Sequence, residues 1–351
     1  MKKAVFLFFI ALAGQASSAF AASVVPDGLF DYRAVLSSDI FTKDEMELLY
    51  SSGAVTSDEI AREFLWTQLL AMPSEKRPKV GLVLSGGGAR GFAHVGVLDV
   101  LRVNGFPVDM IAGTSMGAVV GSMYAAGMPI KTLWQIGNKA TLDIASDDMN
   151  TFGIIRLLTT ETLFSSQRMG AFLNEKIGEK NFSDLKIPFA CVAMDIKTGE
   201  RVVFTDGDVG LAVRASMNLP GVFKPVEYRH RYLVDGGVAD NAPVDVARDM
   251  GADWVFTSLI RTNYTRTSFG SIYSYLMQAL DIRGHMLVDE SLKNSNFILV
   301  PQLGEVGFLD FSKATRAGQL GLEEAFRNID AAKDSLMLFS MGPILNDYTR
   351  K

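Results

Sequence analysis

The sequence predicts a three-layer α/β/α fold in which helices cover both faces of a mostly parallel sheet. Two observations support this prediction. Short apolar runs at residues 80–84 and 108–112 alternate with segments of helical spacing at 92–103 and 118–126, as in a β-α-β-α unit. Both junctions from strand to helix are rich in glycine, which permits a sharp turn of the backbone.

Further apolar runs predict the rest of the sheet. They lie at residues 189–194, 202–204, 232–234, 254–259 and 297–300. Before the sheet we expect a helical N-terminal extension and linker at residues 22–78, because two capping-box patterns begin at Thr42 and Thr56. The main domain is then expected at residues 79–332, with a C-terminal tail at 333–351.

The extreme N-terminus has the layout of a secretory signal peptide. Lys2 and Lys3 precede an apolar run, and small residues end at Ala19-Phe20-Ala21, so we expect a signal peptide at 1–21 and export to the periplasm or secretion. The single cysteine, Cys191, allows no internal disulfide. The formal net charge of −5 and the lack of a basic cluster interleaved with aromatics argue against a nucleic-acid partner.

Residues 110–130 contain no charged side chain, which raises the alternative of a membrane span. The stretch is rich in glycine, alanine, serine and methionine, and its interior contains Gly113-Thr114-Ser115-Met116-Gly117. This pentapeptide is more typical of a turn than of a spanning helix. We therefore expect residues 110–130 to form a strand, a turn and a helix, and not a membrane span.

The first glycine loop, Ser85-Gly86-Gly87-Gly88-Ala89-Arg90-Gly91, is compatible with three kinds of site. It matches a dinucleotide fingerprint, but Asp109 would lie at the opposite edge of the sheet from a bound ribose. It lacks the Gly-Lys-Ser/Thr ending of a nucleoside-triphosphate loop, so no nucleotide is expected. The third interpretation is an oxyanion hole, in which backbone N–H groups each stabilise developing negative charge by roughly 3–4 kcal/mol.

An oxyanion hole requires a nearby nucleophile, and the second glycine-flanked turn supplies one. Gly113 and Gly117 flank Ser115 in the pattern G-x-S-x-G, where a strained turn from strand to helix exposes the serine oxygen. Because the carboxyl ends of adjacent parallel strands meet at one edge of a sheet, both loops are predicted to lie together. Ser115 is therefore the predicted nucleophile.

The serine needs a proton acceptor, and the sequence leaves more than one candidate. Of the three histidines, His94 and His230 are expected to be structural and solvent-exposed, respectively. His285 follows the chain order of the α/β-hydrolase triad, but it lies in a helix-like segment. Asp235 ends an apolar strand before two glycines, where it is either a buried base or a turn aspartate.

Together these blocks resemble the patatin-like phospholipases, most closely the bacterial branch related to neuropathy target esterase. The resemblance covers roughly residues 78–332 in four ordered blocks, which are the glycine loop, the serine pentapeptide, a connecting segment that includes Arg214-Ala215-Ser216, and Asp235-Gly236-Gly237 with Asn241 and Pro243 beyond. The family uses a serine–aspartate dyad. The resemblance thus implies Ser115 as nucleophile and Asp235 as general base and acid.

By the same resemblance, Gly86, Gly87 and Gly88 supply oxyanion N–H groups, and Arg90 either meets a lipid phosphate or braces the loop. The implied activity is hydrolysis of carboxylic esters in phospholipids or lysophospholipids, with transient contact with a membrane surface. The alternatives are a small-ester or thioester hydrolase and a non-catalytic lipid-binding protein. Residues 151–164 are either a lid or ordinary core. No metal or other cofactor is expected, because no pattern has metal-ligand spacing.

Overall fold

The computed structural model describes residues 57–146, 166–261, 272–304 and 306–348. The predicted signal peptide and residues 151–164 lie outside the described residues. The chain divides into two compact units, one formed by Pro78–Ala332 and the other by Met1–Arg77 together with Lys333–Lys351. The segments on either side of the larger unit thus belong to one unit.

An eight-stranded sheet forms the centre of the larger unit, with strand order β5-β6-β3-β2-β1-β7-β8 and β4 paired to β3. The strands are β1 (Val80–Leu84), β2 (Met110–Thr114), β3 (Phe189–Asp195), β4 (Arg201–Phe204), β5 (Val226–Tyr228), β6 (Arg231–Asp235), β7 (Trp254–Ser258) and β8 (Phe297–Leu299). Strands β1, β2, β3, β7 and β8 run parallel, whereas β4 and β6 run antiparallel to β3. The predicted α/β fold with a mostly parallel sheet is confirmed.

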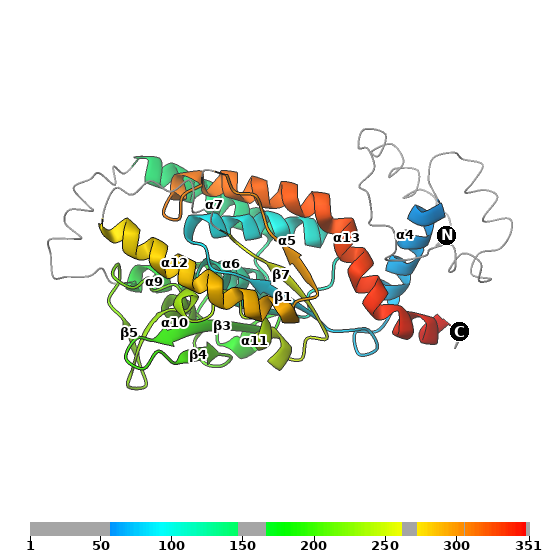
Figure 1. Cartoon of the computed structure of the whole chain (residues 1–351), viewed down its shortest axis with the longest axis horizontal. Helices are drawn as coiled ribbons and strands as arrows, with labels where there is room; N and C mark the ends of the chain where they lie inside the picture. The colour runs from blue at the N-terminus through cyan, green and yellow to red at the C-terminus, as the bar shows by residue number, and fades with distance from the viewer. Residues whose placement is uncertain (1–56, 147–165, 262–271, 305, 349–351) are drawn as a thin grey trace. The chain divides into compact units, whose positions relative to one another are not determined.

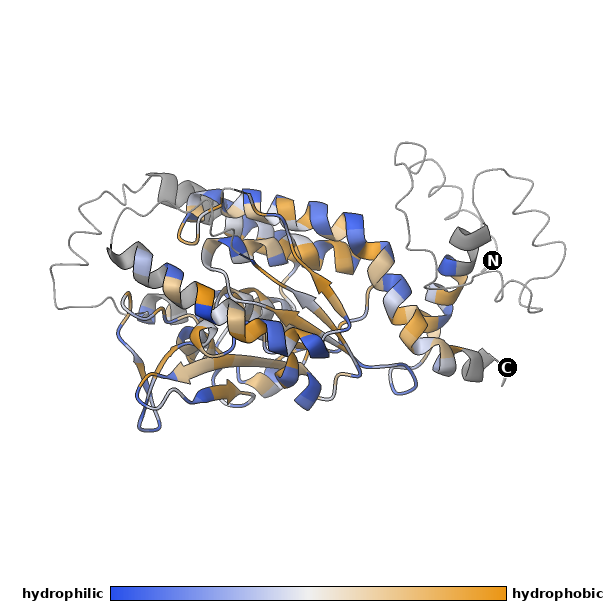
Figure 2. Ribbon diagram, in the orientation of Figure 1, coloured by the Kyte–Doolittle hydropathy of each residue, from blue (hydrophilic) through white to orange (hydrophobic). Residues whose placement is uncertain are grey.

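The four central parallel strands are buried along their whole length, which explains their continuous apolar sequences. Figure 2 shows this as mostly hydrophobic colouring along the sheet, whereas α13 alternates between hydrophilic and hydrophobic positions. Strand β2 extends to Thr114, two residues beyond the predicted end, so the strand leads directly into Ser115. Ser115, the predicted nucleophile, therefore stands at the carboxyl edge of the sheet.

Helices cover both faces of the sheet (Figure 1). The helices described in the larger unit are α5 (Ala93–Val103), α6 (Met116–Ala125), α7 (Ile130–Ser146), α9 (Gln167–Ile177), α10 (Val209–Ser216), α11 (Val244–Asp249), α12 (Ile272–Ser291) and the first part of α13 (Ala314–Tyr348). Short 3-10 turns include η2 (Gly88–Phe92), η4 (Gly236–Val238) and η6 (Leu292–Asn294). Helices α6 and α10 contact β3, and α11 contacts β1, β2 and β7.

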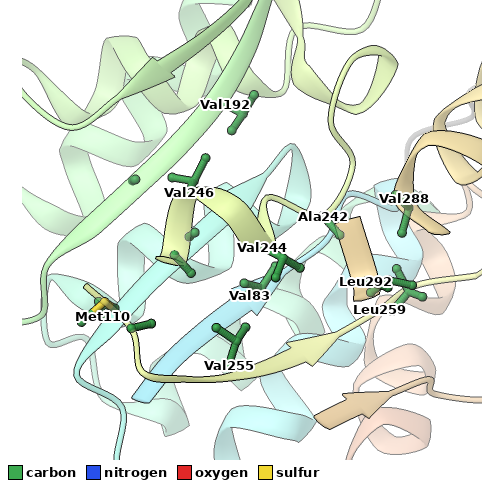
Figure 3. Packing of buried hydrophobic residues seen from close by; sticks show 14 residues of the cluster. Val83, Met110, Val192, Ala242, Val244, Val246, Val255, Leu259, Val288 and Leu292 are labelled. Atoms are coloured by element: carbon green, nitrogen blue, oxygen red, sulfur yellow. The ribbon is translucent and has the colours of Figure 1, made fainter. Parts of the chain in front are cut away.

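The core layer under α11 and α12 is built from alternate residues of the strands. Val83, Ala112 and Val192 face this layer together with Val244 of α11 and Val288 of α12 (Figure 3). Their neighbours along the strands face the opposite layer, because side chains alternate across a strand. There Gly121 of α6 lies against Ile111, Phe189 and Leu84.

The smaller unit contains α4 (Ser57–Ala71) and the end of α13. Arg62 donates two hydrogen bonds to Asp334, from Nε to Oδ1 at 2.9 Å and from Nη2 to Oδ2 at 3.1 Å. Lys333 Nζ lies 5.6 Å from the centre of the Trp66 ring. These contacts join α4 to the end of α13 through a bidentate ion pair and a cation–π contact.

No helix within the described ranges is long and apolar enough to cross a membrane. The stretch 110–130 forms β2, the turn at Ser115 and α6, as predicted from its glycines.

Candidate active site

Ser115 occupies a strained turn between β2 and α6. Its φ of 54° and ψ of −122° lie outside the regions that side-chain-bearing residues favour, which costs on the order of 1–3 kcal/mol. The turn requires glycine on both sides of Ser115. A Cβ on Gly117 would overlap the backbone carbonyl of Leu84, and a Cβ on Gly113 would lie only 2.7 Å from Gly117 O. The backbone N–H of Ser115 donates to Ser216 Oγ at 3.0 Å. The local geometry is that of a nucleophile elbow.

The register of the sheet brings Asp235 to Ser115. Strand β2 pairs with β3 up to Thr114, which is opposite Val192, and β6 pairs with β3 from Asp235, which is opposite Ala193. Because β4 occupies the other edge of β3 along these residues, β2 and β6 share one edge and meet end to end. Ser115 Oγ donates to Asp235 Oδ2 at 2.6 Å across this junction.

The Asp235 carboxyl is almost completely buried, and burial raises its pKa from 3.8 to about 6. The hydrogen bonds from Ser115 Oγ and from the backbone N–H of Gly237, the latter at 2.8 Å to Oδ1, oppose this rise. A carboxylate is ordinarily too weak a base for a serine hydroxyl. Burial moves the basicity of Asp235 toward the value that proton transfer at neutral pH requires.

The glycine loop lies beside Ser115 and Asp235. A Cβ added to Gly86 would be 3.2 Å from Ser115 Cβ. The N–H of Gly86, however, donates to the carbonyl of Asn241 at 3.0 Å. The prediction that Gly86 supplies an oxyanion donor is therefore not supported by its hydrogen bonding. Within the described residues the N–H groups of Gly87 and Gly88 have no acceptor, and Gly88 has the left-handed φ of 56° that glycine tolerates best.

Arg90 is buried and braces the glycine loop. Its Nε donates to Gly87 O at 3.3 Å, and its guanidinium lies 5.4 Å from the centre of the Phe308 ring. Of the two alternatives for Arg90, the structure shows the bracing contact. A contact with a substrate phosphate stays a prediction.

The histidines take different places. His94 is buried, with Nε2 2.8 Å from Ser85 O and Nδ1 2.9 Å from Ser258 Oγ, and burial lowers its pKa to about 4. The neutral ring must donate from Nε2 to the carbonyl, so Nδ1 accepts from Ser258. His230 is exposed at the turn between β5 and β6, as expected. His285 belongs to α12, and its side chain lies outside the described residues.

Two residues of the connecting segment have roles that the sequence reasoning did not assign. Ser216 accepts the N–H of Ser115, and Asn218 O accepts the N–H of Asp235 at 2.9 Å. The motif that contains Ser216 was visible in the sequence, but its contact with Ser115 depends on how α10 packs on the sheet.

Among the described residues no group of three or more histidine, cysteine, aspartate or glutamate side chains could hold a metal ion.

Residues 82–248 match the family model described as patatin-like phospholipase. An uncharacterised NTE family protein of Mycobacterium tuberculosis is 35% identical over 187 residues, which are 52% of this chain and 49% of that protein. Lysophospholipase NTE1 of Mycosarcoma maydis is 37% identical over 182 residues, 50% of this chain and 9% of that protein.

Neuropathy target esterase sws of Drosophila melanogaster is 32% identical over 175 residues, 49% of this chain and 12% of that protein. Among solved structures, VipD from Legionella pneumophila is similar over 73% of this chain and 67% of its own, with 16% identity and a TM-score of 0.46. The chain matches about half the length of the mycobacterial relatives and a smaller share of the fungal and insect proteins.

Proposed function

Residues 82–248 of this chain belong to the patatin-like phospholipase family, as the sequence motifs predict, and from this membership we propose a lipid acyl hydrolase. The substrates are carboxylic esters of phospholipids or lysophospholipids, and the catalytic groups are Ser115 and Asp235. The observation that supports this proposal best is the 2.6 Å hydrogen bond from Ser115 Oγ to the buried Asp235 carboxyl.

In the first half of the proposed reaction, Asp235 Oδ2 accepts the hydroxyl proton as Ser115 Oγ attacks the ester carbonyl carbon. The N–H groups of Gly87 and Gly88 donate to the resulting oxyanion. When the tetrahedral intermediate collapses, the bond to the alcohol oxygen breaks, and that oxygen takes the proton from Asp235. The products are acyl-Ser115 and the free alcohol, which is a lysophospholipid when the substrate is a phospholipid and a glycerophosphodiester when the substrate is a lysophospholipid.

In the second half, water attacks the acyl carbon while Asp235 accepts its proton. The carbon–oxygen bond to Ser115 then breaks, the fatty acid leaves, and Ser115 Oγ recovers the proton from Asp235. The same carboxyl thus serves as base and then as acid in both halves. A group with a pKa of about 6 suits this double role, because both protonation states are accessible near neutral pH.

The proposal is tested by comparing wild type with Ser115→Ala, Asp235→Asn and His285→Ala on phospholipid vesicles and on a soluble nitrophenyl ester. We expect the first two variants to lose at least about 1,000-fold in kcat/KM, since each removes a group that acts as a unit with the other. The histidine variant should remain active. A folded but inactive His285→Ala protein would contradict the dyad, and a wild type that a fluorophosphonate does not label at Ser115 would contradict the enzyme itself.

The ratio of rates on vesicles and on the soluble ester tests the substrate class. A lipid hydrolase is expected to prefer long acyl chains presented at a surface, whereas equal or better turnover of the short ester would favour a small-ester hydrolase.

We also propose that the chain is exported, because Lys2, Lys3 and the small residues up to Ala21 have the layout of a signal peptide. Sequencing the N-terminus of the protein recovered outside the cytoplasm tests this.

A further inference from the structure

The carboxamide of Asn241 lies where the glycine loop and the Asp235 turn meet, yet the reaction above gives it no role. A Cβ on Gly86 would overlap Asn241 Oδ1, and Ser115 Cβ is 3.2 Å from the same point. A Cβ on Gly237 would lie 3.1 Å from Asn241 Oδ1 and 3.2 Å from Asp235 Oδ1. The carboxamide oxygen therefore lies against Gly86 and Gly237, and the side chains of Ser115 and Asp235 border the same two glycines.

The residues that face Asn241 leave room for it. Gly86 and Gly237 have no side chain. Gly284 of α12 faces Asn241, since a Cβ added to Gly284 would lie 4.0 Å from the Cβ of Asn241. Asn241 is buried. A buried polar side chain in contact with the backbone of two catalytic segments is suited to hold those segments at a set distance.

The backbone around Asn241 connects the same segments. Three consecutive backbone carbonyls accept hydrogen bonds. The carbonyl of Asp240 accepts from Thr114 Oγ1 at 2.9 Å, and the carbonyl of Asn241 accepts from the Gly86 N–H at 3.0 Å. The carbonyl of Ala242 accepts from Ser291 Oγ at 3.0 Å. The donors belong to the strand before the nucleophile, to the glycine loop and to α12. The segment 240–242 thus ties the glycine loop to the nucleophile strand.

We propose that Asn241 is a positioning residue whose neutral carboxamide fixes the distance between the glycine loop and the Ser115–Asp235 pair. It thereby aligns the N–H groups of Gly87 and Gly88 with the ester carbonyl that Ser115 attacks. This inference rests on the proposed function. A carboxamide suits the position because it can donate and accept hydrogen bonds without adding charge. A carboxylate there would repel both Asp235 and the developing oxyanion.

Two substitutions test the inference with the soluble nitrophenyl ester as substrate. Asn241→Ala is expected to lower kcat by about 10- to 100-fold, as small misplacements of reacting groups do, with little change in KM. Asn241→Asp keeps the shape and adds a carboxylate near Asp235, so the acid limb of the kcat/KM profile should move to higher pH. Ser291→Ala is the matched control, because it removes a hydrogen bond of the same segment on the side of α12.

The inference is overturned if Asn241→Ala retains kcat within about twofold of wild type, or if the acid limb of Asn241→Asp coincides with that of wild type. It is also overturned if Ser291→Ala loses as much kcat as Asn241→Ala, since the effect would then belong to the whole segment. If thermal unfolding shows that Asn241→Ala does not fold, the pH profile of Asn241→Asp decides alone. Failure of the proposed function would instead appear as a wild type without esterase activity.

Discussion

The environment of the Asp235 carboxyl supports the proposal that this aspartate, and not a histidine, is the base that acts on Ser115. Burial opposes ionisation, and the hydrogen bonds from Ser115 and Gly237 only partly restore it, so the pKa rises to about 6. Asp240 is a second buried carboxyl with a raised pKa, but its side chain is paired with Arg201, whose Nη1 lies 2.6 Å from Oδ2. Of these two carboxyls, Asp235 is the one hydrogen-bonded to the nucleophile.

Because Asp235 and not Asp240 is hydrogen-bonded to Ser115, the pKa of Asp235 should set the pH dependence of activity. Asp235 must be ionised to accept a proton, so kcat/KM for a soluble ester should fall as the pH drops through about 6. The measurement is a kcat/KM profile of wild type and of Asp240→Asn, in which the acid limb should keep its position. A limb that moves in Asp240→Asn, or one near the ordinary pKa of an aspartate, would show that Asp235 does not control the reaction.

Gly284, which has no side chain, allows helix α12 to lie close to the proposed dyad. A Cβ on Gly284 would lie 2.7 Å from Gly237 O, in the turn that follows Asp235. Helix propensity and packing therefore make opposite predictions for Gly284→Ala. Propensity alone would stabilise the protein by about 1 kcal/mol, whereas the steric conflict with the backbone costs on the order of 1–3 kcal/mol.

We expect packing to outweigh propensity, so Gly284→Ala should lower both the free energy of unfolding and kcat by moving the Asp235 turn. Urea unfolding and ester kinetics measure the two effects. Arg283→Ala, at the exposed position just before, is the control on the same helix and should change stability by less than about 0.5 kcal/mol. A stabilised and fully active Gly284→Ala would show that the turn does not depend on α12.

For the whole molecule, two buried groups have opposite effects on stability between neutral and acid pH. The raised pKa of Asp235 means that the folded state binds a proton before the unfolded state does, so stability rises as the pH falls from about 6 to 3.8. The lowered pKa of His94 has the reverse effect, and stability is lost as the pH falls from 6.5 to about 4. Each contribution is on the order of 3 kcal/mol, so the two oppose each other between pH 6 and 4.

Replacing Asp235 by asparagine removes one of the two contributions. Asp235→Asn is expected to be more stable than wild type by about 3 kcal/mol at neutral pH and to lose this advantage by pH 3.8, because protonated aspartate and asparagine are both neutral. Urea unfolding of both proteins across this range measures the difference. An unfolding free energy that differs by a constant amount at all pH values would contradict the buried, ionised Asp235.

The sequence by itself determined the local features. The alternation of apolar runs and helical segments predicted the sheet and its helices, and the glycine-flanked Ser115 predicted the nucleophile turn, because both depend on residues close in the chain. The boundaries of β2 and α6 moved by only two residues or fewer. Residue spacing alone left Asp235 and His285 open as the base, and only the family resemblance favoured Asp235.

The tertiary structure decided how distant segments meet. Asp235 reaches Ser115 because β6 runs antiparallel to β3 and ends against the end of β2, and no local pattern encodes that register. The same long-range packing gives the Gly86 N–H an acceptor in Asn241, which leaves Gly87 and Gly88 as the proposed oxyanion donors. Backbone preferences act over a few residues, whereas strand pairing and burial act between residues more than a hundred positions apart, and the chemistry of this site depends on the latter.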